Sequence, residues 1–227
     1  VAAAISSTVG FAFSAIAAAM IFHAVPGNIE AVQIMMVASI GIQAFSVVAL
    51  RRTICWRACM PFLLGGAAVL PIGIYLLLTI HPHIYISLMG TTIAAYGAYM
   101  LFRRPLLVAK GGIPADMAIG AFGGLTGPLA AFPGALITIW CGMRGWDKTV
   151  QRAVYQPYIL VMQVLTLLAL SAATERAPLN PEILAYALPG VAGACLGLHV
   201  FQRLTDAQFQ RLVNLALIVS GIALMVP

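Results

Sequence analysis

The residues best suited to chemistry form one stretch, residues 120–134, which reads GAFGGLTGPLAAFPG within an otherwise apolar segment. Its first nine residues contain four glycines, a threonine and a Gly-Pro step. Glycine and proline both oppose a continuous helix, so the stretch predicts a broken helix. At membrane depth such a break persists only where the freed backbone groups are buried in protein or line a wet cavity. The stretch is therefore a candidate substrate site.

A half-helix that starts at such a break directs backbone N–H groups and a positive dipole end at its surroundings. Thr126 or Gly127 can cap it, and Pro128 suits its first turn. Helix N-termini bind anions without the cost of a buried lysine or arginine. Near the start of the chain, Ser6, Ser7 and Thr8 before Gly10 could act in the same way. The residues predicted to bind the substrate are Ser7, Thr8, Gly10, Gln43, Gly123, Gly124, Thr126, Gly127, Pro128 and Gln156.

A structural interpretation competes with each of these assignments. Glycine, serine and threonine also occupy close contacts between membrane helices, so packing and binding both stay open for the residues near the start of the chain. In residues 123–128 the density of helix breakers favours a binding site. The amides Gln33, Gln43, Gln156 and Gln163 fit interhelical hydrogen bonds as well as ligand contacts. Arg152 could attract an anion, but a snorkelling arginine near the end of its span is the favoured interpretation.

Composition identifies the class of protein. Of 227 residues, 62% are hydrophobic and 8% charged, with a mean hydropathy of +1.01, whereas soluble domains have about 25% charged residues. The chain is an all-α polytopic membrane protein. Its net charge of +6 comes from short basic clusters between apolar runs, which set topology and do not indicate nucleic-acid binding. The four cysteines lack metal-binding spacing, no catalytic dyad or phosphate loop is present, and we expect neither cofactor, metal nor enzyme activity.

Apolar segments and a repeat divide the chain. Spans or broken segments are expected at residues 1–22, 31–50, 61–80, 84–102, 113–141, 154–172, 183–202 and 209–226. A shift of 124 residues superposes the two halves, residues 1–110 and 111–227, without a gap. The superposed pairs are Gly66 and Gly190, Gly73 and Gly197, Ile80 and Leu204, Tyr85 and Phe209, Leu88 and Leu212, and Gly97 and Gly221. This predicts two homologous halves, as in many transporters.

Loop charges distinguish two topologies. If residues 1–22 and 113–141 cross the membrane, the basic residues split seven inside against five outside. If each is a re-entrant hairpin, the split becomes eleven to one, which the positive-inside rule favours. Each half is then a hairpin plus three transmembrane helices, an odd number of crossings. The halves are therefore expected to be inverted repeats, with two hairpin tips that meet at the midplane.

These residues resemble the sulfite exporter TauE/SafE family of bacterial membrane permeases. The similarity is carried by the related halves, the glycine-rich run from Gly120 to Pro128, the Phe132-Pro133-Gly134 step and the Arg152-Ala153-Val154 start of the next span. It implies a multi-pass protein of the bacterial inner membrane that exports a small sulfur anion such as sulfite or a sulfonate. An anion channel or a permease for a small carboxylate is the alternative. Coupling to a proton or sodium ion and assembly as a homodimer stay open.

Overall fold

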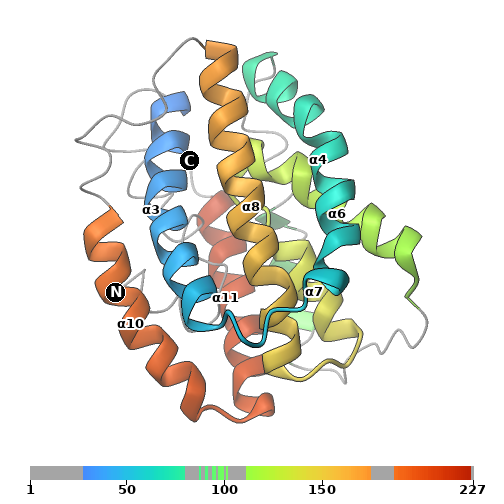
Figure 1. The fold of residues 1–227 in the computed structure, drawn as a ribbon, viewed down its shortest axis with the longest axis vertical. Coiled ribbons are helices and arrows are strands. Elements are labelled where there is room, and N and C mark those ends of the chain that lie inside the picture. Colours follow the sequence, from blue (N-terminus) through green and yellow to red (C-terminus); the bar gives the residue numbers. More distant parts are fainter. Residues whose placement is uncertain are drawn as a thin grey trace.

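The computed structural model describes residues 28–79, 111–174 and 187–225, with individual positions between 87 and 101. Helices make up the regular secondary structure of these residues, as predicted (Figure 1). The helices are α3 (Asn28–Ala49), α4 (Trp56–Thr79), α6 (Ile113–Ala130), α7 (Ala135–Met143), α8 (Lys148–Thr174), α10 (Ala187–Arg203) and α11 (Asp206–Met225). Helix α8 packs against α3, α4, α6, α7 and α11 and is the central element of the bundle.

Local capping explains where two helices begin. Helix α8 starts six residues before the expected span because the Asp147 carboxylate accepts hydrogen bonds from the backbone N–H groups of Thr149 and Val150, at 2.8 and 2.9 Å. Helix α11 starts with a reciprocal capping box, in which Thr205 and Gln208 each bond the other's backbone N–H. Polar residues that look like loop therefore extend both helices beyond their apolar spans.

Polar side chains are buried among the apolar core of the bundle, and large apolar side chains also lie on its outer surface. The buried polar side chains include Gln43, Arg152, Gln156 and Gln163, whereas large apolar side chains such as Leu64 on α4 are exposed. Among the described residues, α4 and α8 are long and apolar enough to cross a membrane, and Gln33–Ala49 of α3 is a shorter apolar helix. This distribution suits a protein whose outer surface contacts lipid.

Helices α4 and α6 approach at backbone distance along a row of glycines. A Cβ atom added to Gly120 would lie 2.1 Å from the carbonyl oxygen of Phe62, and one added to Gly124 would lie 2.1 Å from that of Gly66. Gly65 makes the same kind of contact with the Met117 carbonyl oxygen, at 1.9 Å. Such small-residue contacts let membrane helices pack closely, and here they account for Gly120 and Gly124.

The predicted break exists, but its predicted position was wrong. Helix α6 continues through Gly127 and Pro128 to Ala130, and α7 begins at Ala135 after the N-cap Gly134. Thr126, Gly127 and Pro128 therefore lie in the last turns of α6 and do not start a half-helix. The chain turns at Ala131, whose φ of 53° is left-handed, and the residue before Pro133 is disfavoured in a helix. Pro133, and not Pro128, marks the break.

Candidate functional site

The two ends of the α6–break–α7 unit are joined at one place. The Asp116 carboxylate, on the first turn of α6, accepts a hydrogen bond from the Trp140 indole at 2.7 Å and pairs with the Arg144 guanidinium at 3.3 Å. Arg144 also approaches Gly111, which precedes α6. Because the unit begins and ends at the same place, it is a helical hairpin with its break at the tip.

The tip of this hairpin reaches the crossing of α3 and α8. Ala131 packs in one buried cluster with Met35 and Met36 of α3 and with Leu167 and Leu170 of α8. Helix α7 then starts from the tip, so its N-terminal N–H groups and positive dipole end lie deep in the bundle and not at a surface. This is the geometry that the anion-site prediction requires, shifted by seven residues along the chain.

Several residues that were predicted to bind the substrate lie on α6, next to the break. The Thr126 hydroxyl lies 3.4 Å from the carbonyl oxygens of both Gly123 and Phe132 and so links the last turns of α6 to the break. A Cβ on Gly127 would lie 3.4 Å from Pro133 and 3.6 Å from the Thr166 hydroxyl of α8. Gly123, Thr126, Gly127 and Pro128 therefore lie beside the tip, and their role in substrate binding stays a prediction.

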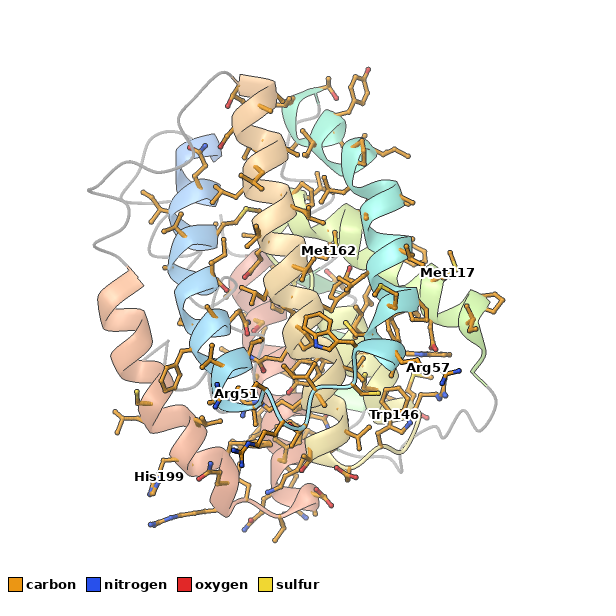
Figure 2. All side chains as sticks on the ribbon, viewed as in Figure 1. Arg51, Arg57, Met117, Trp146, Met162 and His199 are labelled. Atoms are coloured by element: carbon orange, nitrogen blue, oxygen red, sulfur yellow. The ribbon has the colours of Figure 1, made fainter. Side chains whose placement is uncertain are left out.

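Tyr158 joins the hairpin to α8. Its hydroxyl donates a hydrogen bond of 2.8 Å to the Gly120 carbonyl oxygen and occupies the space that a Cβ on Gly66 or Gly123 would need. Met162, near the middle of α8 (Figure 2), lies next to Gly66 of α4. The glycines of α4 and α6 thus make room for one phenol as well as for each other.

A second polar group lies on the other face of α8. The Arg152 side chain is fully buried, at 0% exposure, which contradicts its interpretation as a snorkelling arginine. Its Nε donates to Gln156 Oε1 at 3.1 Å, and Gln156 Nε2 donates in turn to Gln43 Oε1 of α3. The structure therefore brings the predicted residues Gln43 and Gln156 together and adds an arginine. The sequence signal for it was the Arg-x-x-x-Gln spacing, which places both side chains on one helix face.

An aromatic ring of α10 covers this arginine. The Arg152 guanidinium carbon lies 4.2 Å from the centroid of the Phe201 ring. The Lys148 ammonium, one turn earlier on α8, lies 5.1 Å from the same centroid and donates to the carbonyl oxygens of Phe201 and Leu204 at the end of α10. Two cations thus meet one aromatic ring.

A further buried pair joins α3 to α8. Gln163 Nε2 donates to the Ser39 hydroxyl at 2.8 Å, and both side chains are buried. With Gln43 and Gln156 this makes a polar seam between the two helices. Ser7, Thr8 and Gly10, which were predicted as the other half of the site, lie outside the described residues.

The basic connectors that the structure describes gather at one end of the bundle. Arg51, Arg57, Trp146 and His199 lie toward the same end (Figure 2). The contacts of Lys148 with Leu204 bring the connector after α7 to the turn between α10 and α11. The loop charges predict a hairpin that enters and leaves on one side of the membrane, and such a hairpin would place these connectors together.

Comparison of the sequence with known proteins gives one family match. The model of the sulfite exporter TauE/SafE family matches residues 1–224, essentially the whole chain. No curated protein and no solved structure matches the chain. Since the family match covers more than half of the sequence and the described helices are apolar and lipid-compatible, this multi-pass membrane protein belongs to the sulfite exporter TauE/SafE family.

Proposed function

We propose that the protein is a secondary transporter of a small sulfur-containing oxyanion, sulfite or an organosulfonate, which it exports across the bacterial inner membrane. The anion binds near the midplane, between two hairpin tips, and alternating access moves it from one side to the other. Family membership supports the substrate class. The carrying observation is the hairpin itself, because its tip and the start of α7 lie inside the bundle against α3 and α8.

The inverted repeat, of residues 1–110 and 111–227, is part of this proposal. The shift of 124 residues carries α3 onto α8 and α4 onto α10, and in the bundle α3 packs on α10 while α8 packs on α4. Ser39 and Gln163 are exact mates under this shift and are hydrogen-bonded to each other. Residues that meet their own mates lie on a two-fold axis, and α3 and α8 run in opposite directions (Figure 1), as an axis perpendicular to them requires.

A second contact supports the same axis. A Cβ on Gly97 would lie 2.7 Å from the Asn214 carbonyl oxygen and 3.0 Å from Ile218. A Cβ on Gly221, the mate of Gly97, would lie 2.4 Å from the carbonyl oxygen of Gly90 and 2.7 Å from the side chain of Ala94, which are the mates of Asn214 and Ile218. Reciprocal contacts of this kind are characteristic of a two-fold relation.

The repeat also relates the two predicted tips. The same shift carries Ala131, Phe132 and Gly134 of the break onto Ser7, Thr8 and Gly10. We therefore keep Ser7, Thr8 and Gly10 as the second tip, opposite the first across the axis. The glycines and hydroxyls of the two tips, together with the N-terminal N–H groups of α7, supply the donors for an oxyanion.

Transport by purified protein in liposomes tests the proposal. We expect saturable efflux of sulfite or methanesulfonate, and counterflow when unlabelled anion is present on the opposite side. Transport that neither saturates nor shows counterflow would make the protein a channel. Transport of acetate in preference to both sulfur anions would make it a carboxylate permease, and either result would overturn the proposal.

A further inference from the structure

We propose that the surface around the start of α4 binds the headgroups of anionic phospholipids. Arg57 is the main contact, and Arg51 and Arg52 of the preceding connector extend the positive surface; we call these three the rim arginines. The proposal goes beyond the transport function, because its ligand is a lipid of the surrounding membrane and not the transported anion. It is carried by the exposed apolar face of α4, the exposure of the rim arginines and the partners of the nearby aspartates.

Helix α4 has one exposed apolar face along its length. Trp56, Met60 and Leu64 follow one another at intervals of four residues, which places them on the same side of the helix. Tyr75 and Leu78 continue this side toward the end of the helix, and all five side chains are exposed. The helix is long and apolar enough to cross a membrane. Its exposed face therefore contacts the acyl chains of lipids.

Two aromatic side chains define the depth of α4 in the membrane. Trp56, on the first turn, is 49% exposed, and Tyr75, near the last turn, is 65% exposed. At a rise of 1.5 Å per residue they lie about 28 Å apart along the helix, close to the hydrocarbon thickness of about 30 Å. Tryptophan and tyrosine favour the two membrane–water interfaces. Trp56 therefore marks the interface, and Arg57 and the connector before it lie at headgroup depth.

The rim arginines extend from an ordered backbone into the surroundings. The connector between α3 and α4 begins with a turn that Thr53 closes, since its N–H and its hydroxyl both donate to the Leu50 carbonyl oxygen at 2.8 Å. The side chains of Arg51, Arg52 and Arg57 are all exposed, and Arg51 and Arg57 lie toward the basic end of the bundle (Figure 2). A backbone ordered in this way presents the three guanidinium groups at the membrane surface.

The aspartates described at this end have other partners. Asp116 pairs with Arg144, in the one ion pair that the described residues contain. Asp147 caps α8, and Asp206 accepts a hydrogen bond from the backbone N–H of Lys148 at 3.2 Å. Within the described part of the chain, the charge of the rim arginines is therefore not neutralised by carboxylates. Each basic residue near an anionic membrane surface raises the affinity about five-fold.

A phospholipid can use both features of this surface at once. Its acyl chains lie along the exposed face of α4, and its phosphate lies at the level of Arg57, one residue after Trp56. A guanidinium donates two parallel hydrogen bonds to a phosphate. A soluble anion would gain the charge but not the apolar contact, so the structure favours an anionic lipid such as phosphatidylglycerol as the ligand.

Fluorescence quenching of Trp56 by brominated lipids tests the proposal. The chain has three tryptophans, so Trp140→Phe with Trp146→Phe leaves Trp56 as the reporter. This variant is reconstituted in phosphatidylcholine bilayers that contain brominated phosphatidylglycerol or brominated phosphatidylcholine. At low salt we expect phosphatidylglycerol to associate several-fold more strongly, and high salt to reduce this preference. Arg57→Gln removes the charge and should lower the preference by up to about five-fold, whereas Arg57→Lys should retain most of it.

The exposed Arg211→Gln on α11 removes the same charge from another helix and is the matched control. Equal quenching by the two lipids, or an equal loss of preference in Arg57→Gln and Arg211→Gln, would overturn the proposal. Displacement of the lipid by inorganic phosphate at constant ionic strength would make the ligand a soluble anion. Absence of quenching by either lipid would mean that a second copy of the chain covers this face, and both results would also overturn it.

A second measurement keeps the test decisive if the variant with one tryptophan does not fold. Electron paramagnetic resonance of spin-labelled phosphatidylglycerol gives the fraction of lipid immobilised by the protein and requires no change of tryptophan. We expect this fraction to be larger than for spin-labelled phosphatidylcholine with the wild type, and smaller with Arg57→Gln than with Arg211→Gln. Equal fractions for the two lipids with the wild type would refute the lipid site and leave the proposed transport function unaffected.

Discussion

The substitution Gly124→Ala tests whether Gly124 serves helix packing or substrate binding. Gly127, three residues away, provides a matched control. The new Cβ would lie 2.1 Å from the carbonyl oxygen and 2.7 Å from the Cα of Gly66. Both neighbours are backbone atoms of α4, so relief requires the helices to separate by about 1 Å, and a gap of that size removes about a quarter to a half of each dispersion contact. Overpacking of this kind costs about 1–3 kcal/mol.

Gly127→Ala is the control. Its Cβ would meet Pro133 at 3.4 Å and the Thr166 hydroxyl at 3.6 Å, which are ordinary contacts. Both substitutions gain up to about 1 kcal/mol of helix propensity, and this gain cancels when the two variants are compared. We therefore expect Gly124→Ala to be about 1–3 kcal/mol less stable than Gly127→Ala, or roughly 5- to 150-fold in the ratio of folded to unfolded protein.

Unfolding in a titration of denaturing detergent, followed by helical circular dichroism, measures this difference. Equal stability of the two variants would refute the close approach of α4 and α6. Liposome transport of the same variants separates the two roles of the glycines. If Gly127→Ala is stable but does not transport, the backbone at Gly127 contacts the substrate, as the sequence predicts.

Three further predictions concern the hairpin and the axis. The first uses single cysteines in a variant without the native ones. Gly112→Cys and Thr149→Cys should react with an impermeant thiol reagent from the cytoplasmic side, and Ala173→Cys from the opposite side. Labelling of Gly112→Cys and Thr149→Cys from different sides would exclude a hairpin. Asp116→Ala should lower the melting temperature more than Arg144→Ala, because the carboxylate bonds both Trp140 and Arg144; the reverse order would contradict that arrangement. A double-mutant cycle of Ser39→Ala and Gln163→Leu should give a coupling of about 0.6 kcal/mol, up to about 1.7, and zero coupling would remove this pair from the proposed axis.

Part of the site was accessible from residue types alone. The glycine-rich run and the following proline predicted a broken helix, and the break lies within the predicted stretch. Its position within that stretch was not predictable, because two prolines compete for it. Pro128 is held in a continuous helix by the close packing of α4 on α6, whereas Pro133 follows a residue that leaves the helical conformation.

Gln43 and Gln156 also show what the sequence predicts and what depends on the tertiary structure. Their presence as amides in apolar spans predicted an inward orientation, and the structure places them in one hydrogen-bond chain. That they bond each other depends on the crossing of α3 and α8, which joins residues 113 positions apart. No local pattern encodes such a contact.

The sequence by itself determined the helical membrane class of the protein and its family, because hydropathy and short motifs are properties of consecutive residues. It also predicts the internal repeat. Only the tertiary structure decided where the helix breaks and that Arg152 is buried. The burial of Arg152 comes from Phe201 of α10 and from the amide chain to α3, which approach it from elsewhere in the chain. The exposure of a residue depends on the neighbours that pack against it. The sequence predicted Arg152 at the membrane surface, and these neighbours bury it.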